Sequence, residues 1–258
     1  MTGKLAIAVV LALAGTASAH ADPFLRAKGE GRIIASGVFT DSARGFDDDG
    51  NVSDNADYDQ DQVYVLAEYG VSDDLTVILS PSYRSVSIEN DDDIDGLGYT
   101  EVGARYRLAH GQDWLVSTQA LLRIPGAGRQ ESFAQIGSTS TDIDLRLGAA
   151  YAAKAWFGSA EGGYRLRSGD LPNEFHADFS AGTNLTNRFM LLATLANTFS
   201  DGPGENIVNQ SYRYGDAYVS GVFAVTDRIS VQAGYTATIY GKNALRQRGP
   251  LVGVWIHF

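Results

Sequence analysis

The stretch RISVQAGYTATIY, residues Arg228–Tyr240, decides the fold. Its larger apolar side chains alternate one by one with small or polar side chains over the whole segment. Successive side chains of a β-strand point to opposite faces of a sheet, so the pattern gives one apolar face and one polar face. It predicts a strand with lipid or core on one side and a polar space on the other.

The same alternation recurs in most of the chain, and the charged residues keep to one register. The clearest examples are residues 62–70, 114–124, 142–151 and 175–182. A soluble β-sandwich also alternates, so this pattern alone leaves two fold classes open.

The connections between these segments separate the two classes, because short and long connections follow each other in strict turn. Five short turns and six longer polar loops make twelve strands. An even number of strands with short turns at one rim and long loops at the other is typical of outer-membrane barrels. The sequence therefore predicts an all-β, transmembrane, antiparallel up-and-down β-barrel of about 12 strands. The short turns are at 72–74, 110–112, 153–154, 186–187 and 226–227, and the long loops are at 42–58, 91–96, 125–141, 168–173, 200–209 and 241–247.

The beginning of the chain has the pattern of a secretory signal peptide. Lys4 precedes an apolar run from Leu5 to Gly15, and small residues at Ala17, Ala19 and Ala21 provide cleavage sites. An apolar run of about 11 residues falls short of the ~20 that a transmembrane helix needs. We expect residues 1–21 to be a signal peptide and 22–258 to be the barrel of a Gram-negative bacterium.

The composition of the chain argues against some classes of binding partner. The net charge of −11 argues against nucleic acid and against a polybasic membrane patch, and the chain contains no cysteine. After residue 21 no apolar run is long enough for a transmembrane helix, so only a closed barrel could cross a membrane. The expected partners are outer-membrane lipids, the barrel assembly machinery and a small-molecule solute. No cofactor is expected.

The chain ends on GVWIHF, Gly253–Phe258. This end resembles the C-terminal signal of bacterial outer-membrane barrels, in which a glycine, an apolar residue and a terminal aromatic residue occur at fixed offsets. Gly253, Ile256 and Phe258 fit that pattern, whereas Leu251 occupies a position where a polar residue is usual. We expect the segment to be both the last strand and the assembly signal.

The strand register predicts a charged lumen with tyrosines among the charges. One interpretation is a structural network in which the charges pair with each other. The other is a ladder of arginines on one wall that faces acids across a narrow pore and sets its selectivity. Tyrosines at these positions would fill space or stack on an aromatic solute. The candidates are Glu68, Arg84, Glu101, Arg105, Arg107, Arg123, Asp144, Arg146, Glu161, Arg165, Asp178, Tyr214, Asp216 and Tyr218.

Metal binding and catalysis are not predicted. The acidic loop at 46–51 resembles a calcium loop, but Gly45 and Ala56 would occupy its first and twelfth positions and cannot supply side-chain ligands. His176 lies two residues from Asp178, yet no serine signature accompanies them. We therefore expect no enzyme and no metal site.

The first third of the chain resembles the outer-membrane β-barrel family labelled with the MetA pathway of phenol degradation. The resemblance is carried by Gly29–Ile34, Asp49–Val52, Ala56–Tyr58 and Ala67–Val77, and later segments share only the rhythm of strands and turns. It implies a barrel that moves small, often aromatic or hydrophobic, molecules.

The expected function is a narrow channel or uptake route for such molecules. We expect the loop from Gly126 to Thr141 to fold inward and constrict the lumen, because it is long and rich in glycine. The alternative is a closed barrel with a role in adhesion, envelope integrity or polymer export.

Overall fold

The computed structural model describes residues 23–91, 93–126, 136–137, 139–205 and 209–258. The predicted signal peptide and most of the loop at 126–141 lie outside these residues. Among the described residues no helix is long and apolar enough to cross a membrane. The strands are β1 (Gly31–Phe46), β2 (Val52–Ser72), β3 (Leu75–Ile88), β4 (Ile94–His110), β5 (Trp114–Pro125), β6 (Asp142–Ala152), β7 (Trp156–Leu166), β8 (Glu174–Asn184), β9 (Phe189–Ser200), β10 (Arg213–Ala224), β11 (Ile229–Lys242), β12 (Ala244–Leu245) and β13 (Arg248–His257).

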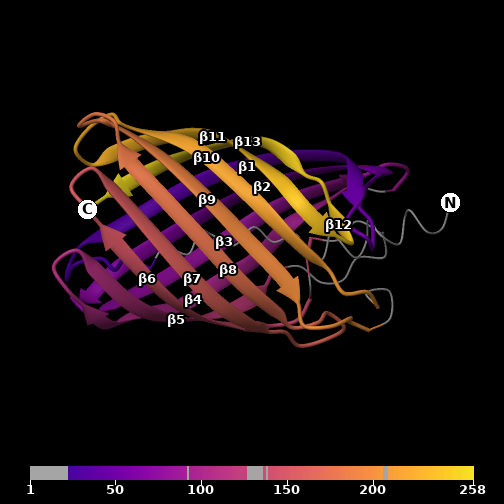
Figure 1. Cartoon of the computed structure of the whole chain (residues 1–258), viewed down its shortest axis with the longest axis horizontal. Helices are drawn as coiled ribbons and strands as arrows, with labels where there is room; N and C mark the ends of the chain where they lie inside the picture. Colours follow the sequence, from indigo (N-terminus) through magenta and orange to yellow (C-terminus); the bar gives the residue numbers. More distant parts are fainter. Residues whose placement is uncertain (1–22, 92, 127–135, 138, 206–208) are drawn as a thin grey trace.

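The strands form one closed antiparallel barrel. Each long strand pairs with its neighbours in sequence, and β1 pairs with both β2 and β13, which closes the sheet. The two-residue strand β12 pairs with the outer end of β1 and adds one short strand to the twelve of the barrel. Figure 1 shows the strands tilted against the long axis. The predicted fold class is confirmed.

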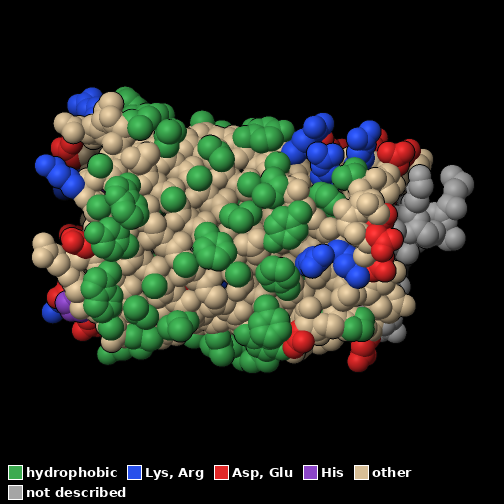
Figure 2. Space-filling view, viewed as in Figure 1, with side chains coloured by type: hydrophobic (Ala, Val, Ile, Leu, Met, Phe, Trp, Pro, Cys, Tyr) green, Lys and Arg blue, Asp and Glu red, His purple; other side chains and the backbone are tan. Residues whose placement is uncertain are grey.

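The outer face of the barrel is apolar, as lipid requires. Leu145 and Leu147 of β6 are 46% and 56% exposed, and Val231 of β11 is 42% exposed. These are positions that the alternation assigned to the apolar face. Figure 2 shows apolar side chains spread over the middle of the visible wall, whereas charged side chains gather near its two ends. The hydrophobic effect therefore holds this surface in the bilayer rather than in a protein core.

Three of the short turns close through a hydroxyl side chain, that of Ser72, Thr186 or Thr226. The Thr226 hydroxyl oxygen accepts hydrogen bonds from the backbone N–H groups of Arg228 and Ile229, at 3.2 and 3.0 Å. Thr186 makes the same pair of bonds at the turn between β8 and β9. These bonds satisfy backbone donors that a tight turn would otherwise leave unpaired.

Two of the predicted loops are largely strand. The predicted loop at 42–58 shrinks to a turn at 47–51, because the pairing of β1 with β2 continues to Phe46 and Val52. The Asp47 carboxylate holds this turn by accepting the backbone N–H groups of Asp49 and Asn51, at 3.0 and 2.8 Å. The predicted loop at 241–247 likewise contains the end of β11 and all of β12. Polar sequence outside the lipid zone does not prevent strand pairing, and this is why the boundaries were wrong.

The turn at 47–51 also contacts β11 through an ion pair. The Lys242 Nζ atom lies 2.9 Å from an Asp48 carboxylate oxygen. The hydrogen bond from Lys242 lowers the pKa of the Asp48 carboxyl below its ordinary value.

The C-terminal residues complete the seam of the barrel. Phe258 donates its backbone N–H to the Gly31 carbonyl at 3.0 Å and accepts the Gly31 N–H at 2.7 Å. Gly253 of β13 lies opposite Ser36 of β1, and Ile256 is 41% exposed on the lipid face. Their recognition by an assembly machinery stays a prediction.

Candidate functional site

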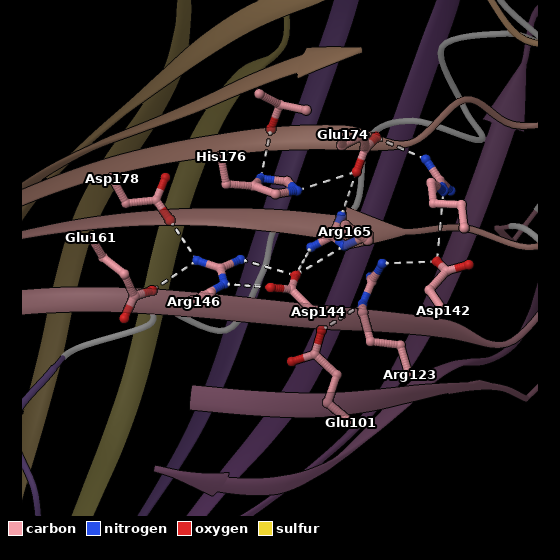
Figure 3. Close-up of polar contacts among 12 residues, drawn as sticks. Glu101, Arg123, Asp142, Asp144, Arg146, Glu161, Arg165, Glu174, His176 and Asp178 are labelled. Atoms are coloured by element: carbon pink, nitrogen blue, oxygen red, sulfur yellow. Dashed lines mark hydrogen bonds and ion pairs between the residues drawn. The ribbon is translucent and has the colours of Figure 1, made fainter. Parts of the chain in front are cut away.

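Charged side chains from β4, β5 and β6 meet in one row inside the barrel. Glu101, Arg123 and Asp142 occupy directly opposite positions in the pairings of β4 with β5 and of β5 with β6. The Arg123 Nε atom lies 2.8 Å from Glu101, and its Nη1 atom lies 3.3 Å from Asp142. The Arg123 guanidinium also stacks over the Tyr99 ring, 4.2 Å from its centroid. The register therefore places opposite charges side by side (Figure 3).

A second row continues around the wall through β6, β7 and β8. Arg165 lies between Asp144, at 2.8 Å, and Glu174, at 2.7 Å. Arg146 contacts three carboxylates, those of Asp144, Glu161 and Asp178, at 2.8, 3.0 and 2.7 Å. Charge-assisted contacts of this length are the strong class of hydrogen bond. We call these two rows, with Arg167 and His176, the ionic network.

Glu174 joins the ionic network to the outer half of the lumen. It accepts a hydrogen bond from Arg167 at 2.8 Å and one from the Tyr212 hydroxyl at 2.6 Å. The His176 ring lies between Glu174, at 3.3 Å, and the Thr198 hydroxyl, at 3.4 Å. His176 is buried in the wall of the barrel.

The acids and bases do not face each other across the lumen. Most of them are neighbours on one wall, because the antiparallel register places Glu101, Arg123 and Asp142, and likewise Asp144, Arg165 and Glu174, directly opposite on adjacent strands. Arg146 of β6 also reaches Asp178, two strands away on β8. This corrects the interpretation as a ladder that creates a field across a pore. Arg107 lies apart from the network at the short-turn rim, where it contacts Asp74 at 2.6 Å.

Arg84, Tyr214 and Asp216 are predicted lumen residues that lie outside the ionic network. Arg84 is buried and donates to Gln62 at 3.0 Å and to the Ile136 carbonyl at 3.2 Å. Ile136 thus shows that one described part of the loop at 126–141 reaches the lumen. Asp216 accepts a hydrogen bond from the Thr238 hydroxyl at 2.7 Å. Tyr214 stacks on Tyr212, with ring centroids 6.4 Å apart.

Apolar side chains fill the middle and the outer end of the lumen. In the middle, Tyr218 packs with Tyr64, Val38 and Leu251. These four residues come from four different strands. At the outer end lies a cluster of Phe46, Ala56, Tyr58, Val86, Ile88, Ala244 and Leu245. These two layers line the lumen with apolar side chains.

Residues 23–28, here called the N-terminal segment, fold into the short-turn end of the lumen. The Phe24 carbonyl accepts a hydrogen bond from Arg105 at 2.7 Å, and the Pro23 carbonyl accepts one from Ser117 at 2.9 Å. The backbone of the segment passes so close to Gly70 that a Cβ atom there would overlap two of its carbonyl oxygens. Glycine at this position makes the close approach possible.

A second charged group anchors this segment. Three guanidiniums converge on the buried Glu68 carboxylate: Arg32 at 2.7 Å, Arg105 at 3.0 Å and Arg26 at 3.5 Å. Arg26 belongs to the N-terminal segment, so Glu68 connects the segment to the wall. Arg105 also donates to Gln119 at 2.7 Å.

Between the N-terminal segment and the wall lies a cavity of about 440 Å³. We call it the lumen cavity. Its lining is largely apolar and includes Phe24 and Leu25 of the segment, with Phe157, Leu192 and Trp255 of the wall. Sites for small molecules have volumes of roughly 300–1,000 Å³ and are mostly apolar. The lumen cavity fits that description.

Sequence reasoning missed several residues of this arrangement. Asp142 and Glu174 share the face of Asp144 and Asp178 by period-two alternation, so the pattern could have identified them. Phe24, Leu25 and Arg26 precede the first strand and follow no periodic pattern. No local signal in the sequence indicated that they enter the barrel.

Comparison with known proteins gives one family and several barrels. The sequence matches the family described as "Putative MetA-pathway of phenol degradation" over residues 37–256. An outer membrane channel from Pseudomonas putida F1 has a similar structure, with a TM-score of 0.79 and 13% identity over 93% of this chain and 100% of that chain. The NanC porin follows with a TM-score of 0.55 and 11% identity over 87% and 98% of the two chains. No curated protein sequence matches the chain.

The translocator domain of the autotransporter NalP from Neisseria meningitidis has the same type of fold. Its TM-score is 0.57, with 14% identity over 90% of each chain. At these identities the similarity concerns the fold. The barrel and its apolar exterior locate the chain in the outer membrane.

Proposed function

Because this chain belongs to the family described as "Putative MetA-pathway of phenol degradation", we propose that its barrel is a narrow passage for small apolar or aromatic molecules across the outer membrane. The observation that carries the proposal is the lumen cavity. A water-filled porin has a polar interior. Here the space left inside the wall is bordered by aromatic and aliphatic side chains such as Phe157, Leu192 and Trp255.

The ionic network has a different role in this proposal. Its side chains are buried and contact each other, so they fill one side of the lumen and stiffen the wall. The passage runs beside them. It leads from the lumen cavity past the layer of Tyr64 and Tyr218 to the outer end, and the N-terminal segment must shift to open it toward the periplasm.

A closed structural barrel is the second candidate, and the same network favours it. Paired charges and two apolar layers would also hold a barrel without a continuous lumen. The two candidates differ in whether ions and solutes pass.

Conductance of the purified protein in planar bilayers tests the proposal. We expect discrete openings that benzyl alcohol interrupts, whereas glycerol at the same concentration does not. Leu192→Trp places a larger ring in the lumen cavity and should weaken the interruptions. The matched control is Leu191→Trp, because Leu191 is the next residue on β9 and is 40% exposed on the lipid face.

A further variant decides between the two candidates if the unmodified protein is silent. Gly70→Val places side-chain atoms where the backbone of the N-terminal segment now lies, so the segment must leave. Openings in Gly70→Val alone would show a passage that the segment closes. Silence in both proteins at all voltages would contradict the passage and favour the closed barrel.

A further inference from the structure

We propose that the lumen cavity binds an organic acid with an apolar body, such as an aromatic or short aliphatic carboxylate. The inference rests on the proposed function, because the bound acid would be a molecule on its way through the barrel. The inference adds that the molecule carries a negative charge as well as an apolar body.

The apolar body has a defined place. Phe157 and Leu192 lie on the wall of the lumen cavity, and Phe24 meets Phe157 edge to face with ring centroids 5.8 Å apart. Aromatic rings prefer this geometry, and a further ring inserted among them would gain the same contacts. The cavity therefore suits a flat or branched apolar group.

The carboxylate also has a defined place. Arg26 and Arg32 line the lumen cavity, whereas Glu68 does not. The side chains of Arg26 and Arg32 are 17% and 8% exposed, and that of Glu68 is 0% exposed. Both arginine side chains therefore reach the edge of the lumen cavity, whereas the side chain of their carboxylate partner Glu68 does not.

Among the described lining residues, Arg26 and Arg32 are the charged ones. They share the Glu68 carboxylate with Arg105. A guanidinium has five N–H donors and can hold more than one carboxylate oxygen. Arg32 keeps its plane near Trp255, 5.4 Å from the ring centroid, which limits its freedom before a ligand arrives.

The rest of the lining does not oppose an anion. Its polar members include Ser36, Thr194 and Gln232, which are neutral. Among the described lining residues there is no aspartate or glutamate. Inside a protein, charges interact more strongly than in water, so the acid should bind more tightly than a neutral molecule of the same shape.

Fluorescence of Trp255 measures this binding directly. The chain has three tryptophans, and Trp114 and Trp156 are 48% and 50% exposed on the outer face. Replacing both with phenylalanine leaves Trp255 as the only indole, at the wall of the cavity. The probes are 3-phenylpropanoate and its neutral isostere 3-phenylpropanamide, titrated into the protein in lipid nanodiscs.

We expect saturable changes in Trp255 emission, with about tenfold higher affinity for the acid than for the amide. In Arg32→Gln the affinity for the acid should fall to that for the amide, and the affinity for the amide should not change. Arg26→Gln should act in the same direction and alters no strand of the barrel. The matched control is Arg167→Gln, an arginine that is 1% exposed and contacts Glu174 outside the cavity lining.

Equal affinities for the acid and the amide would overturn the inference. So would an acid affinity that neither Arg26→Gln nor Arg32→Gln lowers. These outcomes are separate from the failure of the proposed function. A channel that opens but binds the acid and the amide equally would support the proposed function and contradict the acid site. A barrel that shows no openings but binds the acid more tightly would support the acid site and contradict the proposed function.

Discussion

Replacing Arg146 should destabilise the barrel far more than replacing an arginine at its rim. Arg146 contacts three carboxylates at 2.7 to 3.0 Å, and its side chain is 2% exposed. Arg146→Met leaves the Glu161 carboxylate, which is 3% exposed, and the Asp178 carboxylate, which is 12% exposed, without this partner. Breaking a buried ion pair by removing one member costs about 3–5 kcal/mol, and the three contacts place this variant at the upper end.

The matched control is Arg107→Met. Arg107 and its partner Asp74 are 23% and 55% exposed, so solvent screens their contact. Exposed pairs contribute about 0–1 kcal/mol. Both variants replace an arginine with methionine. We expect their losses in free energy of unfolding to differ by roughly 3 kcal/mol or more, because Arg146 is buried and has more carboxylate partners than Arg107.

Urea unfolding in phospholipid vesicles, followed by tryptophan fluorescence, gives the free energies. A third variant combines Arg146→Met with Glu161→Gln and Asp178→Asn, and it should recover most of the loss because no unpartnered charge remains. Equal losses in Arg146→Met and Arg107→Met would refute the reasoning. They would mean that water reaches the ionic network, and that the passage runs along it.

Three shorter predictions concern other parts of the barrel. Tyr218→Ala removes one side of the layer that Tyr64 completes, so single-channel conductance should rise; an unchanged value would mean that the layer does not limit the passage. Deletion of Phe258 should reduce the amount of protein assembled in the outer membrane of cells, measured by heat-modifiable migration of the membrane fraction, and normal levels would count against an assembly signal. Lys242→Met should raise the pKa of Asp48, because the cation that favours its charged form is gone; an NMR titration in which the midpoint does not move would disprove the contact in solution.

The sequence predicted the wall of the barrel better than its contents. Alternation in segments such as residues 228–240 fixes which side chains face lipid, because the period of a strand leaves only two choices. That choice also placed Arg123, Arg146 and Arg165 inside. It did not reveal their partners, since pairing depends on the register between strands and not on the pattern within one strand.

The N-terminal segment and the lumen cavity could not be predicted for a related reason. Phe24 and Arg26 are held by Arg105 and Glu68, which follow them by many residues in the chain. Contacts of this kind arise only when the sheet has closed around the segment. The role of the predicted lumen residues in selectivity stays a prediction, and the cavity now adds Arg26 and Arg32 to the candidates.

The hydrogen bonds between Phe258 and Gly31 occupy the backbone pairing groups of Phe258 in the closed barrel. The N–H and carbonyl of the last residue are both taken by the first strand. A partner that binds this end of the chain by adding a strand to it would need the same two groups. Such a partner must therefore release the N–H and carbonyl of Phe258 when β1 pairs with this end of the chain. It could bind a barrel that is still open, but not one that has closed.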